Sequence, residues 1–170
     1  MSHDVHYSSE KLDWETPRWL VDEARRLLGL NCFHLDPAAD ALNTKAIYYC
    51  GPGSEYSTDG LGEQWFGNVW LNPPYGRSIG RWVEKAAQEV ECGNAVSVCA
   101  LLPARPDTKW WHDHVSRASL VLLLKGRVKF EGAKSSAPFP SALVVWERQA
   151  VPTETRYVLY QPKGDDRRDR

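Results

Sequence analysis

Apolar residues recur at helical spacing in three stretches of the chain. The first stretch begins after Thr16-Pro17, where Thr16 suits the N-cap and Pro17 the first helical position, and it ends at Gly29. The second stretch covers 78–91, where an apolar stripe lies opposite a charged face. The third stretch covers 107–117. The pattern therefore predicts three helices.

Short apolar runs between these helices predict the strands. Residues 38–64 are rich in glycine and proline and show little periodicity, so they are expected to be mostly loop. Strands that alternate with helices predict an α/β fold with a mixed, mostly parallel sheet flanked by helices. Because the last strands follow one another closely, we expect antiparallel pairing at that edge. The predicted strands cover 32–35, 68–71, 95–102, 119–124, 141–146 and 155–160.

The length of 170 residues fits one minimal domain. We expect a flexible N-terminal arm over 1–13, the domain itself over 14–160, and a charged, disordered tail over 161–170. No apolar run is long enough to cross a bilayer, and the N-terminus has no signal pattern. These features predict a cytoplasmic protein without a membrane partner, either a monomer or a weak dimer.

The net charge of -1 hides an asymmetry. Residues 1–64 carry 5 basic and 11 acidic side chains, whereas residues 65–170 carry 16 basic and 11 acidic side chains. The second part of the chain is therefore the part suited to face a polyanion.

Metal and nucleophile chemistry find little support in the sequence. The four cysteines form no C-x-x-C pair, so free thiols are expected. His112 and His114 lie two residues apart on a predicted helix and face different directions, so no metal site is expected. No G-x-S-x-G element indicates a serine nucleophile.

One motif with specific chemistry, Asn72-Pro73-Pro74-Tyr75, directly follows an apolar strand. The side-chain oxygen of Asn72 and the carbonyl of Pro73 can accept hydrogen bonds from the two N–H groups of an aromatic amine. Such bonds draw the amine nitrogen toward tetrahedral geometry and expose its lone pair. Tyr75 offers a flat face on which a base can stack. The alternative is that these residues only form a turn, because Asn and Pro are common in turns.

The order of motifs resembles the phage N-6-adenine DNA methyltransferase family. The resemblance rests on W-x-T-P at 14–17, L-D-P-A-A at 35–39, D-G-L at 59–61, and N-P-P-Y-G at 72–76. Later segments, Leu101 to Trp111 and Pro138 to Val145, fit the same pattern, so the match covers residues 14–147.

The resemblance implies a Rossmann-like class I methyltransferase fold, S-adenosylmethionine as cofactor, and adenine in DNA as substrate. It also implies that the target base is flipped out of the duplex. By position, Asn72, Pro73, Pro74 and Tyr75 would hold the base. The cofactor pocket would be lined by Thr16, Pro17, Asp36, Pro37, Ala38 and Asp59, with Asp59 accepting from the adenine amino group of the cofactor.

Two features depart from the family pattern. The first motif lacks its usual glycines, because Ala39-Asp40 replaces a turn of small residues. No acidic residue ends a second strand, for which 45–50 is the expected place, so Asp36 or Asn43 would have to bind the ribose.

A DNA-facing surface is predicted from the later part of the chain. Residues 102–135 hold seven basic and three acidic side chains, a net charge of +4. The alternative interpretation is that these basic side chains form an ordinary solvated surface, and that the residues after the strand at 95–102 only form a capped helix. Since 14–160 has no room for a recognition domain, sequence preference would come from loops 50–64 and 131–140. The predicted DNA-binding residues are Arg105, Asp107, Trp110, Lys125, Arg127 and Lys129.

Two other functions stay open at this point. One is methylation of another planar amine or amide, such as a base in RNA or a protein glutamine. The other is a non-catalytic DNA-binding relative that has kept the fold.

Overall fold

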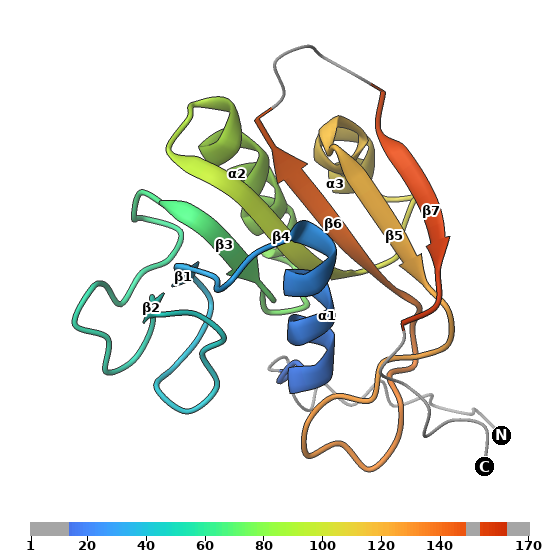
Figure 1. Ribbon diagram of the computed structural model, residues 1–170, viewed down its shortest axis with the longest axis horizontal. Coiled ribbons are helices and arrows are strands. Elements are labelled where there is room, and N and C mark those ends of the chain that lie inside the picture. Colours follow the sequence, from blue (N-terminus) through green and yellow to red (C-terminus); the bar gives the residue numbers. More distant parts are fainter. Residues whose placement is uncertain (1–13, 149–153, 163–170) are drawn as a thin grey trace, which may run out of the picture.

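The computed structural model describes residues 14–148 and 154–162. Three α-helices and one 3-10 helix accompany seven strands in this part of the chain (Figure 1). The predicted arm at 1–13 and most of the predicted tail lie outside the described residues. The helices are α1 (Arg18–Leu28), α2 (Ile79–Glu91), α3 (Lys109–His114) and the 3-10 helix η1 (Val115–Arg117). The strands are β1 (Leu35–Asp36), β2 (Tyr48–Tyr49), β3 (Gly67–Leu71), β4 (Ala95–Pro103), β5 (Leu120–Leu124), β6 (Ser141–Glu147) and β7 (Arg156–Tyr160).

The strands form one sheet in the order β2-β1-β3-β4-β6-β5-β7. Only β6 runs antiparallel to its neighbours, β4 and β5. The sheet is therefore mixed and mostly parallel, as predicted. The expectation of an antiparallel edge is wrong for the last strand, since β7 pairs parallel with β5. The chain crosses to the other end of the sheet between these two strands by way of β6, which lets β7 return in the same direction as β5.

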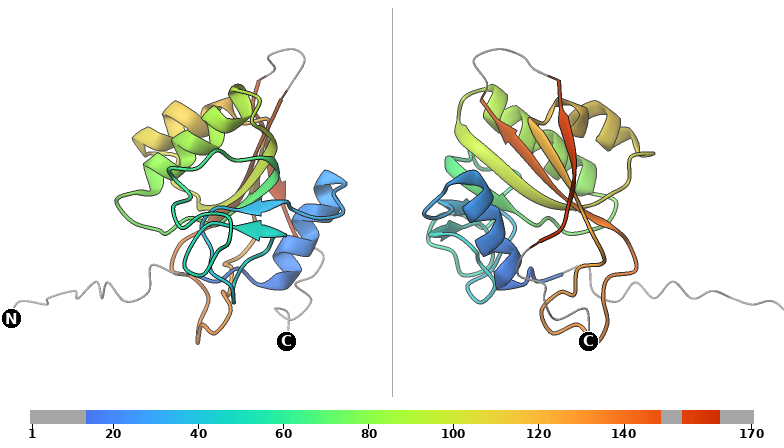
Figure 2. Two further views of the ribbon diagram at one scale, coloured as in Figure 1. Left: turned by 90° about the vertical axis from the view of Figure 1, so that its left-hand side faces the viewer. Right: turned by 45° about the vertical axis from the view of Figure 1, so that its right-hand side comes forward.

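The helices lie on both faces of the sheet (Figure 2). The apolar side of α2 packs with alternate residues of β4 and β6, such as Ala100 and Val144, in one core. The apolar side of α1 packs on the opposite face with residues such as Leu101 and Leu143 in a second core. Strand residues alternate between the two cores because successive side chains of a strand point to opposite faces.

The helix after Thr16-Pro17 begins one residue later than the sequence suggests. Pro17 takes the N-cap position, and the Thr16 side chain makes no capping hydrogen bond, so the prediction of Thr16 as N-cap is wrong. Gly29 ends the helix as predicted, because its left-handed backbone (φ 65°) lets the N–H of Leu30 reach the carbonyl of Arg25.

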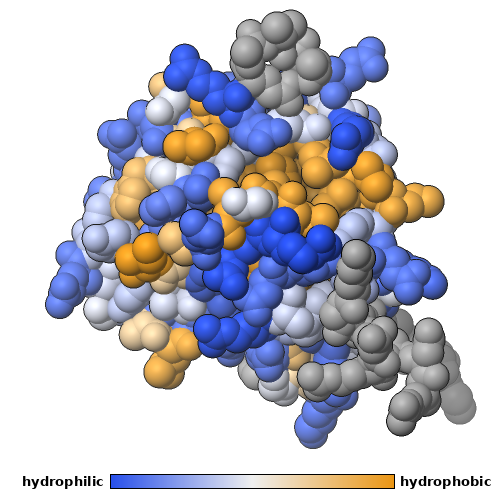
Figure 3. Space-filling model, in the orientation of Figure 1, coloured by the Kyte–Doolittle hydropathy of each residue, from blue (hydrophilic) through white to orange (hydrophobic). Residues whose placement is uncertain are grey.

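A single helix covers only part of its face of the sheet. Apolar side chains gather beside α1 on this face in the space-filling view (Figure 3).

The edge strand β7 is joined to α1 through Glu23, which is 7% exposed and accepts hydrogen bonds from Arg26 and from the Tyr160 hydroxyl. This contact fixes α1 against the sheet at the end of β7.

Most predicted elements are present with boundaries shifted by one to three residues. The predicted third helix divides into α3 and η1, and the predicted first strand shrinks to Leu35–Asp36. The second strand lies at Tyr48–Tyr49, inside the expected 45–50. In the described part of the chain, no helix has the length and apolar character needed to span a bilayer.

Candidate active site

A cavity of about 500 Å³ opens where β1, β2 and β3 end. These three strands are adjacent and parallel, so their carboxyl ends share one edge of the sheet. The chain turns from β1 outward to β2 and then returns to the other side of β1 for β3, and such a reversal is where α/β sheets bind ligands. Eight predicted site residues line the cavity, namely Thr16, Asp36, Pro37, Ala38, Asp59, Asn72, Pro73 and Pro74, whereas Pro17 and Tyr75 do not.

Asn72, the first residue after β3, has an amide with one bound end and one free end. Its Nδ2 donates a hydrogen bond to the main-chain carbonyl of Trp14. Its Oδ1 is buried and has no hydrogen-bond partner among the described residues. Because a carbonyl can only accept, the amide nitrogen must be the end that faces Trp14, and the oxygen is left as the unpartnered end of a side chain that lines the cavity. A buried acceptor of this kind is costly unless a ligand supplies a donor.

Residues 14–16, called the strap below, line the cavity as one segment. Three further contacts hold the strap in place. The Trp14 ring lies 5.1 Å from the Phe130 ring and 6.0 Å from the Phe139 ring. The N–H of Glu131 donates to the carbonyl of Glu15 at 2.9 Å. The strap is therefore fixed by the loop that follows β5. The Trp14 carbonyl of the strap in turn positions the side chain of Asn72.

Tyr75 is locked in place by its hydroxyl and its ring edges. The hydroxyl donates to the carbonyl of Leu101 at 3.0 Å, and burial raises the pKa of Tyr75. The ring meets Phe139 at 5.5 Å and Phe130 at 6.3 Å in edge-on contacts. The same two phenylalanines thus contact both Trp14 and Tyr75, so one aromatic cluster joins the strap to the N-P-P-Y turn.

Asp36 ends β1 as a carboxylate that is only 3% exposed. One of its oxygens accepts from the N–H of Lys45 at 3.0 Å, and the other accepts from the N–H of Ala38 at 3.4 Å. Burial raises the pKa of Asp36 to about 7, and these two backbone bonds oppose part of that rise. A buried carboxylate at the cavity wall favours a cationic ligand.

Two comparisons with known proteins give the family of this chain. A family model described as "DNA N-6-adenine-methyltransferase (Dam)" matches residues 5–162. The chain belongs to this family. It is also 31% identical over 115 residues to a DNA N-6-adenine-methyltransferase of Escherichia phage T1. The matched segment covers 66% of this chain and 44% of that protein. The chain therefore spans less than half the length of that relative.

Two glycines of the loop after β2, Gly51 and Gly60, lie directly against the turn that follows β1. A side chain at Gly60 would overlap the carbonyl oxygen of Pro37, and one at Gly51 would overlap that of Ala39. The loop after β2 can therefore press its backbone onto the Pro37-Ala38-Ala39 turn. A residue with a side chain at either position would force the loop away from this turn.

The predicted ribose-binding residues are partly engaged in the protein itself. Asn43 lines the cavity, but its Oδ1 accepts from the N–H of Asp40 and its Nδ2 donates to Asp40. Asp40 also lines the cavity and caps this turn through the N–H of Leu42. Asp59 is exposed at the cavity and uses one oxygen to accept from the N–H of Leu61. The role of Asp36 or Asn43 toward a ribose stays a prediction.

The predicted DNA-binding residues lie outside the cavity lining. Arg105 and Asp107 are exposed in the loop after β4, and Lys125 follows β5 directly. Arg127 and Lys129 are exposed and alternate with the buried Val128 and Phe130, so both point outward.

Trp110 is half-buried, where it packs beside Trp111 and against Gly80 of α2. The DNA contacts of all six residues stay predictions.

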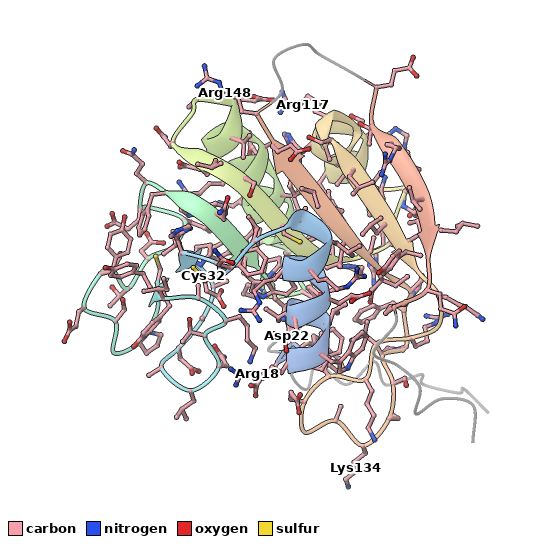
Figure 4. The ribbon with its side chains drawn as sticks, viewed as in Figure 1. Arg18, Asp22, Cys32, Arg117, Lys134 and Arg148 are labelled. Atoms are coloured by element: carbon pink, nitrogen blue, oxygen red, sulfur yellow. The ribbon has the colours of Figure 1, made fainter. Side chains whose placement is uncertain are left out.

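The basic segment 102–135 does not form one face of the molecule. Arg117 lies at one end of the sheet with Arg148, whereas Lys134 lies at the opposite end with Arg18 (Figure 4). The reason is strand direction, since η1 precedes β5 and the loop with Lys134 follows it. Within the segment 102–135, only the residues that follow β4 and β5 lie at the same edge of the sheet as the cavity.

Several contacts at the site could not be predicted from the sequence motifs. The carbonyl of Trp14 acts through the main chain, which no side-chain motif reports. Phe130 and Phe139 reach the site from a loop that shows no periodicity. Lys45, Glu131 and Trp82 also line the cavity from segments without a recognisable motif. All four cysteines carry free thiols, and no group of three metal-ligating side chains occurs in the described ranges.

Replacement of Gly60 by alanine should damage the cavity. Its Cβ would overlap the main chain of Pro37, so the loop must move, and we expect a loss of roughly 1–3 kcal/mol in unfolding free energy. We also expect ligand affinity at the cavity to fall at least about tenfold, as measured by calorimetry. Gly29→Ala is the control, because it has a positive φ but no atom within 4 Å of the new Cβ. Equal ligand affinity in both variants would contradict the close-approach role of Gly60.

Asp36 should make the folded state less stable as pH rises. The folded protein keeps a proton that the unfolded chain releases, because the folded pKa is about 7 against 3.8. Stability from this group is complete below the unfolded pKa and is lost as pH rises through the folded pKa. Relative to Asp36→Asn, the unfolding free energy of the wild type should fall by about 1 kcal/mol per pH unit near about pH 5–6. Denaturant titrations at several pH values measure this slope, and parallel curves would refute the shift.

Proposed function

We propose that this chain transfers a methyl group from S-adenosylmethionine to the exocyclic amine of adenine in DNA. The observation that carries the proposal is the free Oδ1 of Asn72. It is buried and lacks a partner among the described residues, Asn72 lines the cavity, and the Trp14 carbonyl binds the opposite end of the amide. A buried acceptor held in this way is expected where an amine of a ligand donates to it, and is not expected in a turn that binds nothing.

The sheet supports a Rossmann-like class I methyltransferase fold for this proposal. Four neighbouring parallel strands, one antiparallel strand and a return to parallel strands form a single open sheet between helices. The cavity lies at the switch point beside β1, and the N-P-P-Y turn follows β3 on the adjacent side. This arrangement puts a cofactor site and a base site next to each other on one edge.

The cavity fits the cofactor by volume and by chemistry. Its 500 Å³ is in the range of about 300–1,000 Å³ of small-molecule sites. Thr16 lines the cavity, and its hydroxyl is buried and has no partner in the described part of the chain, as expected of a group that a polar ligand would satisfy. Asp36 offers a carboxylate to the positive charges of the cofactor, and Asp59 keeps an oxygen for its adenine amine. When bound, S-adenosylmethionine supplies the electrophilic methyl group.

The N-P-P-Y turn holds the target base in this proposal. Asn72 Oδ1 accepts from one N–H of the adenine amine, and the Pro73 carbonyl accepts from the other. Because both protons are then directed at the protein, the nitrogen lone pair is directed at the methyl group. The contribution is positioning and electrostatics, with no covalent bond to the enzyme. Tyr75, fixed by Leu101 and the two phenylalanines, offers its ring to the base.

DNA is proposed to lie along the edge of the sheet that carries the cavity. Arg105 follows β4 there, and Lys125, Arg127 and Lys129 follow β5. Phosphates along this edge would bring the duplex to the cavity, and the target base would leave the stack at a cost of a few kcal/mol.

Asn72→Ala should abolish methyl transfer and leave cofactor affinity within about twofold, because the side chain acts on the base side of the cavity. Transfer of labelled methyl and calorimetric binding of S-adenosylhomocysteine measure the two quantities. Asn68→Ala is the control, since Asn68 lies at the other end of β3 and bonds with Ser97. Transfer by the Asn72 variant at the wild-type rate would contradict the proposal.

Neutralising Arg127 and Lys129 together (Arg127→Gln, Lys129→Gln) should weaken DNA binding at all sequences. The salt dependence of log K should become shallower by about one to two, or about one for each lost phosphate contact. Titrations of a labelled duplex at several salt concentrations measure this slope. Arg117→Gln, at the opposite end of the sheet, is the control. An unchanged slope in the double variant would place DNA on another surface.

A further inference from the structure

Lys45 is a lysine held against the cavity with unused hydrogen-bonding capacity. Its side chain is 15% exposed, and its ammonium pairs with the Glu15 carboxylate at 3.0 Å. An ammonium has three N–H donors, and this contact is its one hydrogen bond among the described residues. A cation buried to this extent normally needs more partners.

Lys45 also lies next to the buried carboxylate of Asp36. Its backbone N–H donates to Asp36 Oδ2 at 3.0 Å, and both side chains line the same cavity. The wall of the cavity therefore carries one acidic and one basic residue, Asp36 and Lys45, whose contact is a backbone hydrogen bond. A zwitterion complements such a pair.

We infer that Lys45 binds the α-carboxylate of the amino-acid end of the cofactor, and that Glu15 takes the place of this carboxylate when the cavity is empty. The inference rests on the proposed function, which brings S-adenosylmethionine to this cavity. The amino-acid end carries a carboxylate for Lys45 and an ammonium for Asp36. Its class is that of a free α-amino acid attached to an adenosyl group.

Glu15 has room to give way. Its side chain is 42% exposed, and a second cavity of about 510 Å³ adjoins the first. Glu15 and Lys45 line both cavities, so their ion pair lies at the boundary between them. Arg18 lines the second cavity and has no ion-pair partner among the described residues, so it offers the displaced carboxylate a new cation.

Two ligands separate the carboxylate from the rest of the cofactor. S-adenosylhomocysteine has the whole amino-acid end, and its decarboxylated analogue, S-adenosyl-3-thiopropylamine, keeps only the amine. Calorimetry gives the dissociation constant of each ligand for each variant. Lys45→Met should weaken S-adenosylhomocysteine about tenfold or more and leave the analogue within about twofold.

Glu15→Gln should act in the opposite direction. Removal of the competing carboxylate frees Lys45, so S-adenosylhomocysteine should bind about two- to fivefold more tightly, with no gain for the analogue. Arg117→Met is the matched control, because it breaks an exposed ion pair with Glu91 at the other end of the sheet. It should change neither affinity.

The outcomes distinguish this inference from the proposed function. If Lys45→Met weakens both ligands equally, or leaves S-adenosylhomocysteine unchanged, Lys45 has no carboxylate role and the inference is overturned while the cofactor site stands. A gain of both ligands in Glu15→Gln would also overturn it. If the wild-type chain binds neither ligand, the cofactor assignment fails and the inference fails with it.

Discussion

The candidate site depends on one hydrogen bond, from the amide nitrogen of Asn72 to the main-chain carbonyl of Trp14. This contact decides which end of the amide is bound within the protein and which end is left without a partner, since only the nitrogen can donate. It also joins residues that are 58 positions apart, so the turn after β3 is complete only when the strap at 14–16 is in place. Phe130 and Phe139 contact Trp14 of the strap, and the same two rings contact Tyr75. The proposed cofactor contacts and the proposed base contacts therefore depend on the same segment of the chain.

Much of the fold could be predicted because each helix and most strands bury an apolar stripe of characteristic period. The stripe of α2 and the run in β4 are clear in the sequence and sit where expected. By contrast, β2 has only two residues, both at least partly exposed, so its pairing with β1 leaves no hydrophobic pattern. The direction of β7 could not be predicted from the hydrophobic pattern either, because periodicity shows which face of a strand is buried and not which way the strand runs.

The site was predicted where chemistry resides in side chains close together in sequence, as in Asn72-Pro73-Pro74. It was not predicted where the main chain or a distant loop does the work. The carbonyl of Trp14 and the glycines that approach Pro37 and Ala39 belong to segments whose partners lie elsewhere in the chain. Strand direction also divides the basic segment 102–135, because Arg117 precedes β5 and Lys125 follows it. Neighbours in sequence therefore end on opposite edges of the sheet.

The proposed function requires that a base amine in DNA receives the methyl group at this cavity. The most direct measurement incubates the chain with labelled S-adenosylmethionine and DNA, RNA or protein as separate acceptors, then identifies the labelled product after digestion to nucleosides or amino acids. The account predicts N-6-methyladenine from DNA as the main product. Label confined to RNA or protein, or found in DNA on a base other than adenine, would contradict it.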